Sequence, residues 1–215
     1  MPKDILNSEQ IVAYFDFDGT LTTRDTLIPF LLYTCGFGKF IKYLPLLFSW
    51  VVLYVCKLID NEKLKERTLK VMIGGKSYGE LDVVAKKFAK FKLNTYLEPE
   101  IYAKMEWHIE QGHKVYIVSA NLELYLKYWI KQHQLSGIIA TEIEFVDELC
   151  TGKLSTKNCY GPQKPLRVKQ YLQQYGLNYK YSYGYGNSRG DYELLDMVDE
   201  GYFVHGDKLV AWEKK

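Results

Sequence analysis

The sequence alternates short, β-forming apolar runs with longer segments in which apolar residues recur at helical spacing. Runs of the first kind occupy Ile11–Phe15, Val115–Val118 and Tyr179–Tyr185. Helices between strands bring the chain back to the same end of a sheet, so this alternation predicts strands that are mainly parallel. We therefore expect an α/β protein. A length of 215 residues is enough for one core with a modest insert.

The first apolar run ends at two carboxylates. The letters DFDGT follow Phe15 directly and place Asp16 and Asp18 just past a buried strand. Ligands of open α/β sheets bind at the carboxyl ends of the strands, so both side chains are expected in one crevice. Two like charges there are costly unless a cation or a proton shares them. Gly19 permits a sharp turn and a close approach of substrate. The alternative is an Asp-rich turn that caps the next helix.

Two later strand ends carry groups that suit a phosphate ester. Ser119 follows Val115–Val118 and offers a hydroxyl and a backbone N–H at a strand-to-helix turn, although a simple helix cap is its commoner role. The letters GNSRGD follow Tyr179–Tyr185 and place Asn187 and Asp191 four residues apart, where both can face a cation.

A lysine is the remaining group that a phosphate site needs. Lys164 precedes a helix that we predict at Pro165–Tyr175, and it could bring positive charge to a phosphate and to an attacking carboxylate. Lys157 and Lys169 are rival candidates, and a surface lysine is the alternative for each of them.

The charge of the chain is divided unevenly. Residues 27–92 carry 12 Lys or Arg and 5 Asp or Glu, a net charge of +7, whereas the remaining residues carry 16 and 21, a net charge of −5. The total of +2 argues against a nucleic-acid partner, which calls for a far more basic chain. A basic segment is thus inserted into an acidic one.

The first part of this basic segment is strongly apolar. Leu27–Ile59 carries Lys39, Lys42 and Lys57 as its only charges, and its most apolar part, Leu44–Cys56, has 13 residues. A membrane span needs about 20 such residues. A packed helix, a helix that touches a membrane surface or an apolar substrate, and a transmembrane helix all remain open. Lysines beside aromatic residues are typical of membrane interfaces.

Taken together, these residues resemble the haloacid dehalogenase (HAD) superfamily of aspartate-nucleophile phosphatases. Four motifs stand in the order of that family: DFDGTLT at Asp16–Thr22, VSA at Val118–Ala120, Lys164, and GNSRGD at Gly186–Asp191. The insert resembles a type-1 helical cap. The surroundings of the third motif resemble subfamily IB, which includes phosphoserine phosphatases and bacterial phosphatidylglycerophosphate phosphatases. The resemblance implies a Rossmann-like parallel sheet flanked by helices, with a core at 1–21 and 99–215 and an α-helical cap at 22–98.

The resemblance also implies a mechanism. Asp16 is the nucleophile and forms an aspartyl-phosphate, while Asp18 acts as general acid and then as general base. Mg²⁺, a hard cation that prefers oxygen ligands, is the implied cofactor. Its implied ligands are Asp16, Asp18, Asn187 and Asp191. The implied phosphate-binding residues are Gly19, Thr20, Ser119, Ala120 and Lys164.

One position departs from the family pattern. Asn187 stands where the family normally has an aspartate that binds the metal. An amide oxygen can coordinate Mg²⁺ but adds no charge, so we expect weaker metal affinity. The alternatives are an active phosphatase with an amide ligand and a degenerate fold that binds phosphate esters without turnover.

The substrate is predicted only by class. Asp25 lies nine residues after Asp16, where phosphoserine phosphatases place a cap glutamate that reads the substrate amine, although Asp25 could equally cap the first cap helix. A small phosphorylated metabolite such as phosphoserine is the first expectation. The apolar, basic cap favours, as an alternative, a lysolipid-like or phosphatidylglycerophosphate-like substrate at a membrane surface.

The compartment is predicted from the cysteines and from the N-terminus. The four cysteines form no CxxC pair, and Met1–Gln10 is polar without an apolar run. We expect reduced thiols and a cytoplasmic protein, with peripheral contact to the inner membrane surface through the cap as an alternative.

Overall fold

The computed structural model describes residues 10–214, so the predicted polar segment at the N-terminus lies, apart from Gln10, outside the described residues. In chain order its strands and helices are β1 (Ile11–Phe15), α1 (Leu27–Val55), α2 (Asn61–Ile73), α3 (Tyr78–Phe91), α4 (Pro99–Glu110), β2 (Lys114–Leu122), α5 (Glu123–Gln132), β3 (Gly137–Thr141), β4 (Ile143–Val146), β5 (Leu149–Leu154), α6 (Gln163–Gln174), β6 (Tyr181–Gly186), α7 (Tyr192–Met197), β7 (Glu200–His205) and β8 (Lys208–Ala211). Short 3₁₀ turns occupy Leu93–Tyr96 and Arg189–Asp191.

The main sheet has six strands in the order β3-β2-β1-β6-β7-β8. Its first five strands are parallel and β8 alone is antiparallel, so the prediction of an α/β fold with a parallel sheet flanked by helices is confirmed. The sequence analysis missed β8, because this edge strand is exposed along its whole length and shows no apolar alternation.

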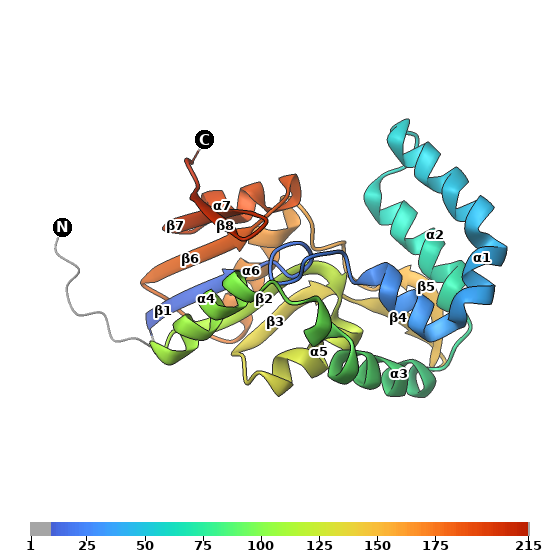
Figure 1. The fold of residues 1–215 in the computed structure, drawn as a ribbon, viewed down its shortest axis with the longest axis horizontal. Coiled ribbons are helices and arrows are strands. Elements are labelled where there is room, and N and C mark those ends of the chain that lie inside the picture. The colour runs from blue at the N-terminus through green and yellow to red at the C-terminus, as the bar shows by residue number, and fades with distance from the viewer. Residues whose placement is uncertain (1–9, 215) are drawn as a thin grey trace.

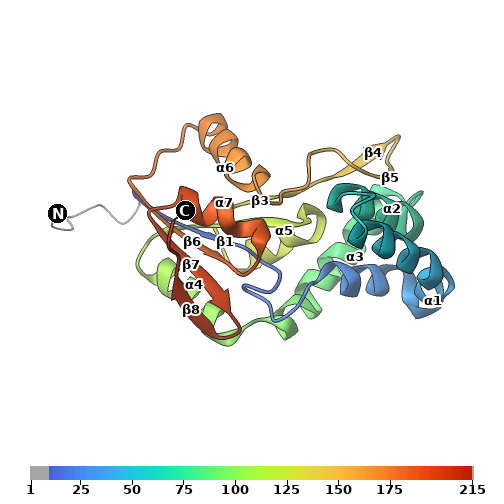
Figure 2. The ribbon, with the colours of Figure 1, turned by 90° about the horizontal axis from the view of Figure 1, so that it is seen from above.

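Both faces of the sheet are covered by helices. Ala13 and Phe15 of β1 pack in one apolar cluster with α4 and α5, whereas Val12 and Tyr14 pack in a second cluster with α6 and α7. Alternate residues of a strand point to opposite faces, so one short apolar run serves both layers. Figure 2 shows α6 and α4 on opposite sides of the strands.

The helices α1, α2 and α3, together with the hairpin β4–β5, lie beside the sheet and are called the lobe (Figure 1). The hairpin packs directly on α2 and its connection to α3, where Gly75 N–H donates to Cys150 O at 2.8 Å and Cys150 N–H donates to Lys76 O at 2.9 Å. Gly152 has a φ of +81°, and a Cβ there would lie 2.3 Å from the backbone of Lys70, so glycine is required for this contact. The limits of a cap at 22–98 stay a prediction.

Two details of the lobe differ from the predicted elements. The residues Ile138–Phe145, whose β-forming side chains predict one strand, are divided, because β3 belongs to the main sheet while β4 pairs with β5. The long helix α1 is interrupted at Gly36, whose φ of +77° is not helical. The first break allows one run of chain to contribute to two separate sheets.

Candidate active site

The site lies where the three central strands end. β1 lies between β2 and β6, so the residues after Phe15, Val118 and Gly186 meet at one edge of the sheet. The sequence analysis expected this meeting because the carboxyl ends of parallel strands share an edge. The order of the parallel strands brings these residues together, although they lie far apart in the sequence.

Lys164 joins the two buried carboxylates of the site. Its ammonium lies 2.6 Å from Asp16 Oδ1 and 2.5 Å from Asp191 Oδ1, and it also donates to Val118 O at 2.8 Å. Burial alone would lower the pKa of Lys164, but the two carboxylates outweigh this effect and raise it. The rivals Lys157 and Lys169 are both exposed, whereas Lys164 is buried. The structure therefore places Lys164, of these three, in contact with Asp16.

Asp18 is held by two side chains that the sequence analysis did not single out for the site. Thr26 donates its hydroxyl to Asp18 Oδ1 at 2.7 Å, and Asn121 Nδ2 donates to Asp18 Oδ2. Asn121 also donates to Thr26 Oγ1 at 2.8 Å, so the three side chains form a closed network. This network fixes the carboxyl of Asp18 at the edge of the cavity.

The two aspartates differ in their affinity for a proton. Burial, and next the Asp191 carboxylate, raise the pKa of Asp16 to about 6, while Lys164 opposes this rise. Burial, and next the Asp25 carboxylate, raise the pKa of Asp18 to about 8, against the hydrogen bond from Thr26. The pKa of Asp18 is thus raised further than the pKa of Asp16, so Asp18 is the better proton donor of the two. Such a division suits one nucleophile and one acid.

The residues predicted to bind Mg²⁺ provide oxygen atoms, which is the donor type this ion prefers. The Thr20 hydroxyl lies 3.2 Å from Asp16 Oδ2 and 3.3 Å from Asn187 Oδ1, so the carboxylate and the amide oxygen gather around one atom. Gly19 makes room for the amide, because its φ is +75° and a Cβ would lie 2.2 Å from Asn187 Nδ2. These oxygen donors suit Mg²⁺. Their total negative charge is low, because Asn187 supplies a neutral amide oxygen.

Asp191 is more heavily engaged than the sequence analysis expected. Its Oδ1 contacts Lys164, and its Oδ2 accepts from Asn187 N, Ser188 N and Ser188 Oγ at 3.2, 2.9 and 2.8 Å. Its carboxylate thus orders the GNSRGD loop and pairs with the lysine. Among residues 10–214, no group of three or more His, Cys, Asp or Glu side chains is arranged to hold a metal ion. A direct metal role for Asp191 stays a prediction.

The segment after Val118 leaves the regular ladder. Ser119 pairs with Ala140 and Leu122 with Thr141, so two residues of β2 bulge out between these pairs. The Ser119 hydroxyl accepts from Asn121 N–H at 3.0 Å and lines the cavity, where its own O–H can donate to a substrate oxygen. Ala120 contributes its backbone to the same wall. The bulge therefore turns a strand end into a lining segment.

The cavity has a volume of about 500 Å³. Of the predicted site residues, Asp16, Asp18, Asp25, Ser119, Ala120, Lys164 and Asp191 line it, while Gly19, Thr20 and Asn187 are outside its lining. The opposite wall is apolar and comes largely from α1, including Leu44, Leu47, Phe48 and Val51. The cavity thus has a charged floor at the sheet and an apolar wall in the lobe.

Asp25 has the capping role that the sequence left open. Its Oδ1 accepts from Leu27 N–H at 2.9 Å and from Ile28 N–H at 3.4 Å, at the start of α1. The residue also lines the cavity, so a contact with substrate is compatible with capping. The specificity role of Asp25 stays a prediction.

Lys65 of α2 is a cavity residue that the sequence analysis missed. Its ammonium donates to Ala120 O at 2.6 Å and to Asn158 Oδ1 at 2.7 Å, which links the lobe to the end of β2. Burial lowers the pKa of Lys65 to about 8, although Asp25 and Asp18 oppose this shift. In the sequence Lys65 is one of many lysines on an amphipathic helix, and no local signal separates it from them. Asn121, by contrast, directly follows the VSA motif.

The fold thus combines a mainly parallel sheet with a cavity at its strand ends, lined by two aspartates and a buried lysine. A family model described as haloacid dehalogenase-like hydrolase matches residues 13–196, and the chain belongs to this family. It is thus a hydrolase of this family, as predicted from the sequence, and the proteins similar to it include phosphoserine phosphatases.

Individual relatives agree with this assignment. The chain is 26% identical over 211 residues to protein CicA of Caulobacter vibrioides, covering 94% of this chain and 90% of that protein. It is 23% identical to the phosphoserine phosphatase SerB1 of Mycobacterium tuberculosis, covering 91% of this chain and 65% of the relative. A crystal structure of a protein of unknown function from Bordetella pertussis superposes with a TM-score of 0.79 at 23% identity, covering 90% and 89% of the two chains.

Proposed function

We propose that the protein hydrolyses phosphate monoesters through an aspartyl-phosphate on Asp16, with Mg²⁺ as cofactor. The observation that carries this proposal is the arrangement of two carboxyls in one cavity. Asp16 is paired with Lys164 at 2.6 Å, and Asp18 is fixed beside it by Thr26 and Asn121. This arrangement supplies a nucleophile, a positive charge and a proton donor together.

In the first step a carboxylate oxygen of Asp16 forms a bond to phosphorus, and the bond from phosphorus to the ester oxygen breaks. The leaving oxygen takes the proton of the Asp18 carboxyl and departs as an alcohol. Lys164 and the Ser119 hydroxyl stabilise the negative charge on the phosphoryl oxygens.

In the second step Asp18, now ionised, accepts a proton from a water molecule whose oxygen attacks phosphorus. The bond between phosphorus and Asp16 breaks, and inorganic phosphate leaves. Asp18 regains its proton and Asp16 its carboxylate, so the site returns to its starting state. The network of Thr26 and Asn121 keeps Asp18 in position for both transfers.

The Asp16 carboxylate, the Asp18 backbone carbonyl and Asn187 Oδ1 would hold the magnesium ion. When bound, the ion supplies positive charge that offsets the charge of the phosphoryl oxygens. Thr20 lies between the Asp16 and Asn187 oxygens and keeps both in place.

For the substrate we infer a phosphorylated small molecule, with phosphoserine as the first candidate and the cytoplasm as the place of action. The apolar wall of the cavity favours a second candidate, a lysolipid-like phosphate ester. Leu44, Leu47 and Phe48 face the same cavity as Asp16, and a small zwitterion has no apolar part for them to cover. A series of phosphate monoesters of increasing chain length separates the two candidates, because kcat/KM rises with chain length only for the second.

The central test replaces the nucleophile. Asp16→Asn keeps the volume of the side chain but removes the attacking charge, so turnover of p-nitrophenyl phosphate with Mg²⁺ should fall by on the order of a thousandfold or more. Asp207→Asn is the matched control, because Asp207 is exposed in the turn between β7 and β8.

A second measurement distinguishes the possible results. Beryllofluoride mimics a phosphoryl group on aspartate, and ¹⁹F NMR should detect an adduct in the wild type that Asp16→Asn lacks. Undiminished turnover in Asp16→Asn contradicts the mechanism. Phosphate binding without turnover or adduct in the wild type would show the degenerate, non-catalytic alternative instead.

A further inference from the structure

The second half of α1, after the break at Gly36, exposes a continuous apolar face. Phe37, Phe48 and Val55 are 71%, 67% and 71% exposed. The exposed residues of this face, which we call the α1 outer face, are Phe37, Ile41, Leu44, Phe48, Val52 and Val55. Their spacing of three, four and seven residues places them along one side of the helix.

Most of the surface of α1 is exposed, and only a part of it packs against the rest of the protein. Leu47 is buried, Phe40, Tyr43 and Trp50 pack against the apolar core, and Lys39 Nζ donates to Met72 O of α2 at 2.8 Å. Only 6% of the most apolar stretch of α1 is buried. A helix that is apolar all round needs an apolar partner on every side. Large exposed apolar patches mark interaction surfaces.

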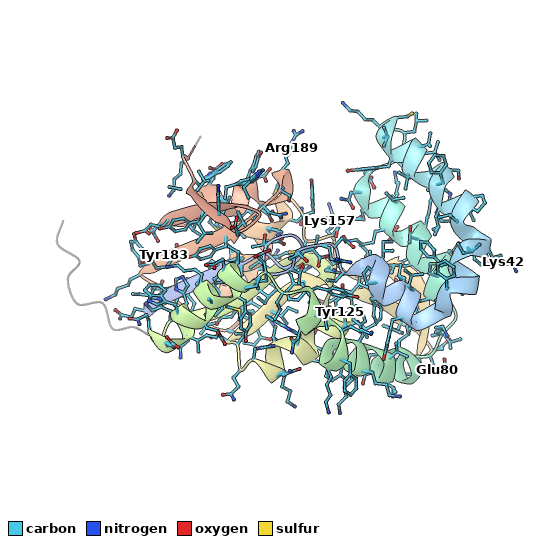
Figure 3. The ribbon with its side chains drawn as sticks, viewed as in Figure 1. Lys42, Glu80, Tyr125, Lys157, Tyr183 and Arg189 are labelled. Atoms are coloured by element: carbon cyan, nitrogen blue, oxygen red, sulfur yellow. The ribbon has the colours of Figure 1, made fainter. Side chains whose placement is uncertain are left out.

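The charges beside the α1 outer face identify the partner. Leu27–Ile59 holds no acidic residue, while Lys42 and Lys57 are exposed. Figure 3 shows Lys42 at the outer margin of the lobe, away from the sheet. Apolar side chains flanked by lysines complement a bilayer whose headgroups are negative. The ammonium of Lys42 also lies 5.6 Å from the ring centre of Tyr43, and lysine beside an aromatic ring is typical of membrane interfaces.

The attachment of α1 decides how it would meet a bilayer. Among the described residues, α1 is the one helix long and apolar enough to cross a membrane by length and composition. It nevertheless begins with the buried residues Phe30 and Leu31, breaks at Gly36, and is bonded to α2 through Lys39. A spanning helix would have to leave these contacts, whereas a helix lying in the plane of the interface keeps them.

We propose that the α1 outer face docks the protein on the surface of an anionic lipid bilayer, with α1 lying in the plane of the headgroups. This docking is independent of the proposed catalysis, because Phe37, Ile41, Val52 and Val55 are outside the cavity lining. Leu44 and Phe48 belong to both surfaces, so the docked helix would form the wall between the bilayer and the cavity.

The test is flotation of the full chain with vesicles. We expect binding to phosphatidylcholine vesicles that contain phosphatidylglycerol, and weaker binding to phosphatidylcholine alone. The double variant Phe37→Ser with Val55→Ser should lower the partition constant between vesicles and water by roughly tenfold or more, because two large exposed apolar side chains are lost. The matched control is Phe91→Ser with Val83→Ser on α3, where the same residue types are 58% and 54% exposed. Lys42→Gln and Lys57→Gln should each weaken binding to the anionic vesicles by about fivefold.

Several results would overturn the proposal. These are no flotation with anionic vesicles, equal flotation of the α1 and α3 double variants, and release only by detergent, which indicates a spanning helix. Light scattering that shows a dimer lost in Phe37→Ser with Val55→Ser would assign the face to a second copy of the chain. Turnover of p-nitrophenyl phosphate by the same variant, at the wild-type rate, shows that any loss of docking is not a loss of folding or catalysis.

Discussion

The side chain of Asn187 is a neutral amide, so it adds no negative charge to the proposed metal site. Its oxygen shares the Thr20 hydroxyl with Asp16, and the carboxylate of Asp191 is occupied by Lys164 and by the GNSRGD loop. Among the described residues, we propose one carboxylate, one amide oxygen and one backbone carbonyl as ligands of Mg²⁺, while a direct metal role for Asp191 stays a prediction. The strength of Mg²⁺ binding should depend on Asn187.

Asn187→Asp should tighten Mg²⁺ binding by on the order of tenfold or more, the scale on which even outer-shell changes alter metal affinity. The new carboxylate adds a negative charge at the position where Asn187 Oδ1 meets Thr20. Isothermal titration of the substrate-free protein with MgCl₂ measures the effect, and Asn187→Ala, which removes the oxygen, should change affinity in the opposite direction. Equal affinities in all three proteins would show that residue 187 is not a ligand.

Lys65 lets the lobe contribute a charge to the cavity. Lys65→Met should raise KM for an anionic substrate by on the order of tenfold, with little change in kcat, because a charged hydrogen-bond donor is lost from the wall. The exposed Lys63→Met on the same helix is the control. An unchanged KM in Lys65→Met would remove this residue from substrate binding.

The pKa of Lys65 gives the same prediction a pH dependence. Its ammonium is present below a pKa of about 8 and lost above it, so KM should rise as the pH passes upward through this value. Asp25, Asp18, Lys164 and Cys159 surround the group and set this pKa. Lys65→Arg keeps its charge and should not show the rise.

Some of these residues could be predicted from the sequence and others could not. Asp16, Asp18 and Ser119 follow apolar runs directly, and the ends of parallel strands meet at one edge whatever the rest of the chain does. Lys65 reaches the site only through the packing of α2 on the strand ends. That packing is a tertiary property, and the helical pattern of α2 is the same with or without it.

At the scale of elements, the short strands were easier to predict than the point at which the chain passes from the main sheet to the lobe hairpin. Ile138–Phe145 resembles a single strand because it is rich in β-branched and aromatic residues and contains neither Gly nor Pro, but Glu142 separates a strand of the main sheet from a strand of the lobe hairpin. The division depends on which strand each half pairs with, and β propensity does not contain this information. The strand β8 was missed for a different reason, because it is exposed along its whole length and shows no apolar alternation.

The contact between α4 and β6 makes the fold sensitive to acid. His108 is fully buried, and its ring nitrogens lie 2.8 Å from Tyr185 Oη and from His113 Nδ1. Burial, and next His113 and Lys104, lower the pKa of His108 to about 3. In the unfolded chain the ordinary value is 6.5, so the unfolded state binds the additional proton between these two values.

The free energy of unfolding should therefore fall as the pH is lowered from 6.5 toward 3, with His108 contributing a slope of up to about 1.4 kcal/mol per pH unit. Above pH 6.5 this contribution is fully present. His108→Gln should remove its part of the slope, whereas the exposed His205→Gln should leave the slope as it is. Urea unfolding at a series of pH values measures this, and equal slopes in wild type and His108→Gln would contradict it.

At the scale of the whole molecule, the lobe and the sheet are joined by an aromatic cluster as well as by polar contacts. Phe30 of α1 lies 5.4 Å from Phe88 of α3 and 4.7 Å from Tyr125 of α5, measured between ring centres. Tyr125 also lies 3.0 Å from the Thr26 hydroxyl, which holds Asp18. Figure 3 places Tyr125 between the sheet and the lobe. This aromatic cluster between the lobe and the sheet therefore reaches the side chains that hold Asp18.

Phe30→Ala should lower the free energy of unfolding by about 3–5 kcal/mol, because a fully buried ring of α1 that contacts α3 and α5 is replaced by a cavity. Phe37→Ala, seven residues later and 71% exposed, should change it by less than about 0.5 kcal/mol. Denaturant unfolding of both variants measures the difference. Similar losses of unfolding free energy in both variants would show that the packing of Phe30 between the lobe and the sheet contributes little to stability.

The hairpin that covers α2 has a consequence for synthesis on the ribosome. α2 ends at Ile73, but the hairpin strand that packs on it begins only at Leu149, after β2, α5 and β3 have been made. At roughly 5–20 residues per second, α2 emerges several seconds before this partner exists. Throughout that interval the nascent chain presents both the uncovered side of α2 and the apolar surface of α1. We therefore expect the nascent chain to be most prone to aggregation during this interval.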